Sequence, residues 1–107
     1  MLDLTHDELS IIQSILKKFV PCLEVRVFGS RLAGNAKKFS DLDLAIMTDN
    51  PLPLSLRGAI LDAFSESSLP FKVDVVDWAQ TNADFQQVIA NHFETLQTPM
   101  KPQKDPT

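Results

Sequence analysis

Residues 28–46, FGSRLAGNAKKFSDLDLAI, contain two groups of side chains that could bind a phosphorylated ligand and its metal ions. Gly29 and Ser30 end an apolar run. A glycine lets the backbone approach a ligand closely, and a serine hydroxyl can donate a hydrogen bond to a phosphate oxygen. Backbone N–H groups at a turn from a strand into a helix also favour phosphate. An ordinary tight turn is the alternative, because Gly-Ser pairs are common in turns.

Asp41 and Asp43 interrupt the next apolar run, although aspartate is disfavoured in strands. Residues two apart in a strand point to the same face and lie about 7 Å apart, so these carboxylates can converge on one or two hard cations. Two like charges so close repel each other unless a cation neutralises them. A polar, solvent-facing side of a small sheet is the alternative.

Asp74 is a third aspartate inside an apolar run, FKVDVVDW, in which Asp77 is predicted to end the strand. If this strand lies beside the strand of Asp41 and Asp43, the three carboxylates form a triad; otherwise Asp74 is a lone polar residue on a solvated face. A triad opposite a phosphate turn suits phosphoryl chemistry on a nucleoside triphosphate. Two Mg²⁺ ions would bridge carboxylates and phosphates, and Asp74 would hold the activating ion or accept the proton of the attacking hydroxyl.

Positive charge gathers near the Gly-Ser pair on a chain whose net charge is −4. Arg26, Arg31, Lys37 and Lys38 are four of the ten basic residues, with no acidic residue between the first and the last. This pattern predicts a local anion site, whereas the overall charge argues against broad nucleic-acid binding. Arg31 could pair with a β- or γ-phosphate. A solvated surface arginine is the alternative.

The periodicity of the apolar residues predicts the elements that must position these side chains. Thr5 and Glu8 have the spacing of a helix capping box, and the later runs alternate apolar with polar residues as strands do. The predicted order is a helix over 5–20, a strand over 23–28, a short helix over 30–35, a strand over 40–47, a helix with the inward residues Leu56, Ile60, Ala63 and Phe64, a strand over 71–78, and a last helix that Thr81 or Asn82 caps and that carries Phe85, Val88, Ile89, Phe93 and Leu96.

Length and composition predict one folded domain. The chain has 107 residues, of which 44% are hydrophobic and 22% charged. We expect the domain to span residues 1–96, followed by a disordered, proline-rich tail over 97–107. No window approaches the roughly 18 apolar residues of a membrane span, and the N-terminus is acidic, so we expect a cytoplasmic protein without a membrane partner. The one cysteine, Cys22, is expected to be a buried apolar residue.

The spacing of Gly29-Ser30, ten further residues, Asp41-Leu42-Asp43 and the later Asp74 resembles the GSx10DxD…D signature of the DNA polymerase β-like nucleotidyltransferase superfamily. The compact length and the text of residues 28–46 are most similar to the minimal nucleotidyltransferases, or MNT proteins, which are typically encoded beside a HEPN-domain partner. The resemblance covers the chain from the first helix to about Leu96. It implies an α+β fold with a small mixed sheet of three or more strands, flanked by helices in the order α-β-α-β-α-β-α.

The resemblance also implies a role for each matching residue. Gly29 and Ser30 would bind the triphosphate of ATP, Asp41 and Asp43 would bind two Mg²⁺ ions, and Asp74 would complete the catalytic triad. In MNT/HEPN pairs the HEPN protein is an RNase toxin, and the MNT antitoxin neutralises it by transferring AMP from ATP to a tyrosine hydroxyl. Since every motif position is intact, the resemblance implies an active enzyme.

One departure from the superfamily concerns the acceptor. Larger members carry a further domain that holds it, and this chain has none. We therefore expect the acceptor to come from a partner protein or from a second copy of the chain, in a hetero-oligomer or a homodimer. Two other functions stay open, namely a nucleotide-binding antitoxin that acts by occlusion and a transferase for a small hydroxyl compound such as an aminoglycoside.

Overall fold

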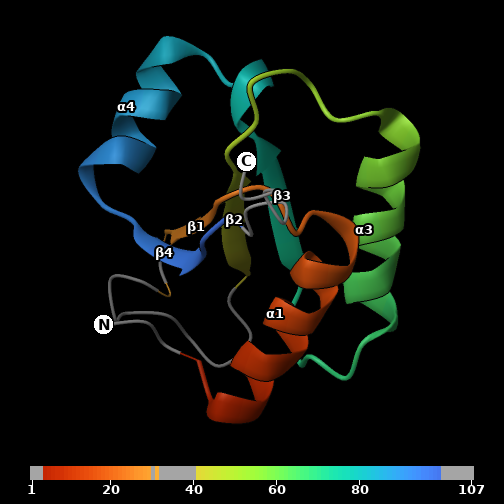
Figure 1. Cartoon of the computed structure of the whole chain (residues 1–107). Helices are drawn as coiled ribbons and strands as arrows, with labels where there is room; N and C mark the ends of the chain where they lie inside the picture. Colours follow the sequence, from red (N-terminus) through yellow and green to blue (C-terminus); the bar gives the residue numbers. More distant parts are fainter. Residues whose placement is uncertain (1–3, 30, 32–40, 100–107) are drawn as a thin grey trace, which may run out of the picture.

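The computed structural model describes residues 4–29, 31 and 41–99 as a mixed α+β fold (Figure 1). One four-stranded sheet has the strand order β3-β2-β1-β4. The elements in chain order are α1 (His6–Phe19), β1 (Val25–Phe28), β2 (Leu42–Ile46), α3 (Leu54–Glu66), β3 (Val73–Asp77), the 3-10 turn η1 (Trp78–Gln80), α4 (Ala83–Asn91) and β4 (Glu94–Gln97). The predicted fold class is confirmed, and all three predicted strands are present.

The capping box predicted from the sequence starts α1. The Thr5 hydroxyl accepts a hydrogen bond from the Glu8 backbone N–H at 3.1 Å, and the Glu8 carboxylate accepts one from the Thr5 N–H at 3.0 Å. These bonds satisfy two of the donors that a helix start leaves without partners. The helix ends at Phe19, ahead of Pro21, and it buries Ile12 and Leu16 against the sheet.

The sheet is mixed because β1 pairs antiparallel with both β2 and β4, whereas β2 pairs parallel with β3. In this register Phe28 lies opposite Asp43, and Asp43 lies opposite Asp74. The last residue of β1 and the first residues of β2 and β3 therefore meet at one end of the sheet. We call this the carboxylate end.

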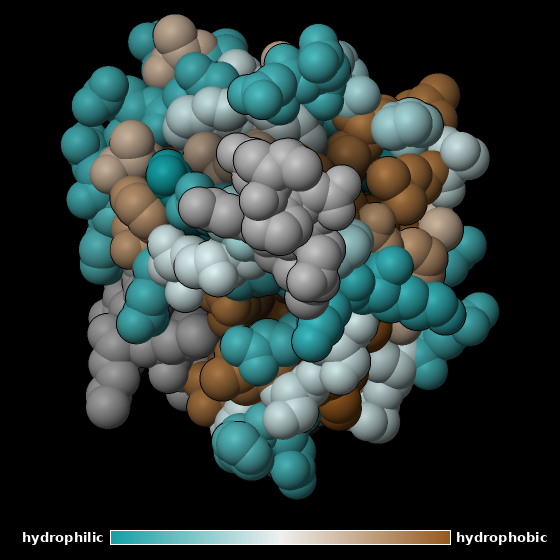
Figure 2. All heavy atoms as spheres, viewed as in Figure 1, coloured by the Kyte–Doolittle hydropathy of each residue, from teal (hydrophilic) through white to brown (hydrophobic). Residues whose placement is uncertain are grey.

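Helices cover both faces of the sheet. Helices α1 and α3 lie together on one face, and α4 lies on the other (Figure 1). Because side chains alternate along a strand, Leu44 and Val75 enter the main core under α1 and α3, while Phe28 and Ala45 join a smaller cluster with Ile89 of α4. Figure 2 shows polar side chains over much of the surface, with apolar ones gathered over the upper part of α3.

The prediction that the last helix continues to Leu96 is wrong. Helix α4 starts at the predicted cap, where the Asn82 side chain accepts a hydrogen bond from the Phe85 N–H, but it ends at Asn91. His92 is extended, and the next residues pair with the outer edge of β1 as β4. An unpaired edge of β1 would leave backbone donors and acceptors without partners, so the added strand satisfies them. Leu96 is buried in the main core from β4.

Three further expectations concern the ends and loops. Cys22, predicted to be buried, is exposed, because the turn between α1 and β1 places it outside the core. Gln97, assigned to the tail, is the last residue of β4. Residues 100–107 and all of the predicted helix over 30–35 except Arg31 lie outside the described residues.

Among the helices described, none has the length and apolar character that a membrane crossing requires.

The position of β4 predicts that Leu96→Ala lowers the free energy of unfolding by about 2–4 kcal/mol, because it leaves a cavity in the main core. Val88→Ala is the control, since Val88 is 59% exposed on α4 and should change stability by about 0.5 kcal/mol or less. Urea unfolding followed by circular dichroism measures both. Equal, small effects would mean that residues 94–97 do not pack as a strand.

Candidate active site

The carboxylate end brings together two of the three predicted aspartates. Asp43 of β2 and Asp74 of β3 are register partners and, by alternation, face the side of the sheet away from α1 and α3. The sequence-based condition that the third strand lies beside the second is therefore met. Asp41 precedes β2 by one residue, is exposed, and lies two residues from Asp43.

Gly29 lies directly against the Asp43 carboxylate. Its φ angle is +88°, a conformation that side chains other than glycine rarely adopt. A Cβ at this position would overlap Asp43 Oδ2. A glycine is therefore required here both for the turn after β1 and for the close approach of that turn to the carboxylate.

Burial and charge act together on Asp43. Desolvation raises the pKa of its carboxyl above the ordinary value of 3.8, and the negative charges of Asp74 and then Asp41 raise it further. A bound cation would relieve the same repulsion. Lys72 Nζ lies 3.7 Å from Asp74 Oδ1, but both side chains are largely exposed, so this ion pair contributes little.

The oxygen donors at the carboxylate end suit Mg²⁺, which prefers carboxylate and phosphate ligands. Within the described residues, no group of three or more aspartate, glutamate, histidine or cysteine side chains is arranged closely enough to hold a metal ion. Mg²⁺ commonly binds through one or two carboxylates together with substrate phosphates, rather than in a cage made by protein alone. The pair of Asp43 and Asp74 could supply the carboxylates for an ion bound in that way.

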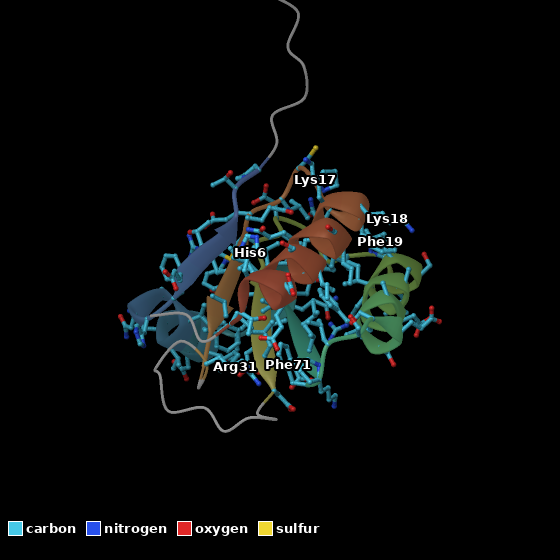
Figure 3. The ribbon with its side chains drawn as sticks, turned by 90° about the horizontal axis from the view of Figure 1, so that it is seen from below. His6, Lys17, Lys18, Phe19, Arg31 and Phe71 are labelled. Atoms are coloured by element: carbon cyan, nitrogen blue, oxygen red, sulfur yellow. The ribbon has the colours of Figure 1, made fainter. Side chains whose placement is uncertain are left out.

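Arg31 is buried rather than solvated. It is 4% exposed, and its guanidinium carbon lies 3.9 Å from the centroid of the Phe71 ring. Figure 3 shows the two side chains next to each other at one end of the sheet. The alternative of a solvated surface arginine is therefore wrong. Ser30, Lys37 and Lys38 lie outside the described residues.

Arg26, the first residue of the predicted basic group, does not contribute to an anion site. Its Nε donates to the Glu24 carboxylate at 2.8 Å, and its guanidinium lies 4.0 Å from the Phe93 ring and 6.0 Å from the Trp78 ring. These partners neutralise and cover its charge. The local positive charge predicted at the turn thus comes from Arg31 within the described part of the chain.

Asp77 and Thr48 form a buried network that sequence reasoning missed. Asp77 ends β3, as predicted, and is 3% exposed. Its carboxylate accepts hydrogen bonds from the Thr48 hydroxyl and, at 2.7 Å, from the Leu52 N–H, while the Thr48 oxygen accepts one from the Ala79 N–H at 3.0 Å. The network joins the segments that follow β2 and β3 at the end of the sheet opposite the carboxylates. It therefore adds side-chain bonds to the strand pairing that places Asp43 opposite Asp74.

Two hollows of about 480 and 500 Å³ lie elsewhere on the described surface. The first lies between α1 and β4, and the second between α3 and the start of β3. None of the three aspartates lines either hollow. The row of carboxylates, and not the size of a cavity, therefore identifies the candidate site.

Comparisons with known proteins agree with this geometry. The family model "Polymerase beta, Nucleotidyltransferase" matches residues 10–98. A "Probable protein adenylyltransferase MntA" from Haemophilus influenzae is 45% identical over 106 residues, which cover 99% of this chain and 93% of the relative.

Solved structures of toxin–antitoxin complexes share the fold. A chain of a toxin–antitoxin crystal structure with AMP-PNP superimposes with a TM-score of 0.72 at 24% identity, covering 84% of this chain and 73% of the other. A chain from a complex of a tri-AMPylated Shewanella oneidensis HEPN toxin with its MNT antitoxin superimposes with a TM-score of 0.63 at 22% identity. The match covers 84% of this chain and 69% of the other.

The contact between Gly29 and Asp43 predicts opposite effects for two glycine substitutions. Gly29→Ala should lower the free energy of unfolding by about 1–3 kcal/mol, because it adds backbone strain and displaces the carboxylate. Gly58→Ala in α3 meets no atom within 4 Å and should stabilise the helix by about 0.5–1 kcal/mol. Thermal unfolding compares the two, and a Gly29→Ala protein as stable as the wild type would contradict the close approach.

The raised pKa of Asp43 predicts a pH-dependent gain in stability from Asp43→Asn in metal-free buffer. The folded chain holds the Asp43 proton more tightly than the unfolded chain, so this group lowers wild-type stability as the pH rises from 3.8 through the raised pKa. The amide of the Asp43→Asn variant is neutral throughout, so the variant should have the higher Tm at pH 7 and lose this advantage below pH 3.8.

The control is Asp49→Asn, which changes an exposed aspartate in the loop after β2, away from the carboxylate end. It should shift the Tm little at any pH. A Tm difference between Asp43→Asn and the wild type that does not vary with pH would contradict the assigned repulsion.

Proposed function

Because the chain belongs to the polymerase beta nucleotidyltransferase family, we propose that it transfers AMP from ATP to a hydroxyl group of a partner protein. The observation that carries the proposal is the arrangement at the carboxylate end, where Asp43 and Asp74 lie side by side on the same face of the sheet and Gly29 lies against Asp43. A glycine turn beside paired carboxylates could hold a triphosphate together with the metal ions that assist nucleotidyl transfer.

In the proposed reaction, the acceptor oxygen forms a bond to the α-phosphorus of ATP while the bond from that phosphorus to the bridging oxygen breaks, and pyrophosphate leaves. Asp41 and Asp43 would hold Mg²⁺, and Asp74 would share an ion or accept the hydroxyl proton. When bound, two Mg²⁺ ions would offset the charge on the phosphates and favour loss of that proton. Burial and then the charges of Asp74 and Asp41 raise the pKa of Asp43, and a bound cation would offset the repulsive part, which supports a role in cation binding.

The triphosphate would lie over the turn that follows β1. Gly29 would let its backbone approach the phosphates, and Ser30 would donate from its hydroxyl. Arg31 would offset negative charge from its position on Phe71. In this proposal the leaving pyrophosphate would lie near the donors of the turn and the α-phosphate nearer to the carboxylates.

The comparisons support a protein acceptor. The Haemophilus influenzae relative is named a probable protein adenylyltransferase, and one structural neighbour comes from a complex with a tri-AMPylated HEPN toxin. We therefore propose that the acceptor is a tyrosine hydroxyl of a HEPN RNase toxin, that the modification makes this chain the antitoxin, and that both proteins act in the cytoplasm.

The test incubates the chain with α-labelled ATP, Mg²⁺ and the product of the adjacent gene, which the proposal expects to be a HEPN protein. We expect label on the partner, and a loss of at least about 100-fold in rate with Asp43→Asn or Asp74→Asn. Asp49→Asn, which changes an exposed aspartate away from the carboxylates, should label the partner at the wild-type rate. Replacing the modified tyrosine of the partner by phenylalanine should abolish labelling.

Absence of label with the wild-type chain would contradict the proposal. Neutralisation of the toxin in cells by Asp43→Asn, at the wild-type level and matched expression, would favour inhibition by occlusion. Labelling of an aminoglycoside without any protein partner would favour the small-acceptor function.

A further inference from the structure

The ring of Phe71 lies against the guanidinium of Arg31 and contributes to the stability of its buried position. Arg31 is 4% exposed, and taking a guanidinium out of water is unfavourable unless other groups compensate. The guanidinium carbon lies 3.9 Å from the Phe71 ring centroid, a distance at which the aromatic face attracts the cation (Figure 3). The ring therefore stabilises one position of this side chain.

Phe71 is itself fixed by the main core. It is 8% exposed, packs in the same core cluster as Phe64, and lies two residues before β3 begins. Arg31, the other partner in this contact, lies two residues after Gly29 in the sequence. The pair thus connects the turn after β1 to the segment that leads to Asp74.

These two segments belong to strands that are not neighbours. In the strand order β3-β2-β1-β4, β2 lies between β1 and β3. The contact between Arg31 and Phe71 consequently joins the two sides of the strand that carries Asp43. This contact can hold the turn at Gly29 at a fixed distance from Asp74, although the carboxylates of Asp43 and Asp74 repel each other.

We propose that Phe71 is a positioning residue for nucleotide binding, which acts by holding Arg31 beside the Gly29 turn. The inference rests on the proposed function, in which the triphosphate lies over that turn. Loss of the ring removes one of the contacts that fix the guanidinium, so that ATP binding has to restrict its motion further. The aromatic face, rather than the apolar volume of Phe71, is the required feature.

The test measures ATP binding to the full chain by calorimetry with Mg²⁺ present, which needs neither turnover nor a partner. Phe71→Leu keeps an apolar side chain but removes the ring, and should weaken ATP binding about five- to tenfold. Phe71→Tyr keeps the ring and should bind ATP like the wild type. The matched control is Phe64→Leu, the same change at a buried phenylalanine of the same core, which should lose stability in thermal unfolding but keep its affinity for ATP.

A double-mutant cycle separates positioning from a general loss of stability. If Phe71 acts through Arg31, the double variant Phe71→Leu/Arg31→Gln should bind ATP no more weakly than Arg31→Gln alone. Additive losses, or equal losses in Phe71→Leu and Phe64→Leu, would overturn the role of Phe71 and leave the proposed function intact. Failure of the wild-type chain to bind ATP would overturn the proposed function and the inference with it.

Discussion

Repulsion among carboxylates at one end of the sheet is the constraint on which the site depends. The parallel pairing of β2 and β3 places Asp43 opposite Asp74, and Asp41 adds a third negative charge nearby. The fold tolerates this arrangement because the same strands bury Leu42, Leu44, Val73 and Val75 on their other face. Burial of apolar side chains on one face thus offsets an unfavourable interaction on the other, and a cation would turn that interaction into a favourable one.

The carboxylates are held from both ends of the sheet. At the far end, the buried Asp77 carboxylate joins the segments after β2 and β3 through Thr48 and Leu52. At the carboxylate end, Arg31 and Phe71 connect the segments next to β1 and β3. A site that must bind charges at set distances needs such supports, because catalytic groups work only within narrow geometric limits.

The parts of the fold that depend on local patterns could be predicted from the sequence. The capping box at Thr5 and Glu8 and the alternation in residues 42–46 and 73–77 depend on neighbours a few residues away, and each predicted the observed element. The prediction for β4 was wrong because Phe93 and Leu96 continue the helical spacing of α4, and no glycine or proline marks its end. Only the open edge of β1, a tertiary feature, selects a strand there.

In the candidate site, too, the features set by local sequence could be predicted, and those set by tertiary contacts could not. The types and spacing of Gly29, Asp43 and Asp74 predicted that they would lie together, and the structure brings Gly29 and Asp74 next to Asp43. Their phosphate and metal chemistry stays a prediction, which rests on the ligands that such ions commonly take. The partners of Arg31 and Asp77 were not predictable, because the Asp77 partner Thr48 is 29 residues away and nothing in its local sequence marks it. Arginine next to a phosphate motif also has two interpretations, a ligand or a packed side chain, and only the fold places it on Phe71.

The most direct test of a metal-dependent nucleotide site at the carboxylate end is the Tm of the full chain with Mg²⁺ alone, ATP alone and both together. A ligand that binds only the folded state raises the Tm. The Tm of the wild-type chain should rise most when Mg²⁺ and ATP are both present. The Asp43→Asn variant should stay folded, but its Tm should rise no more with both ligands than with either one alone. An equal rise in Tm in the wild type and in Asp43→Asn with both ligands, or no rise in either, would contradict the assignment of the site.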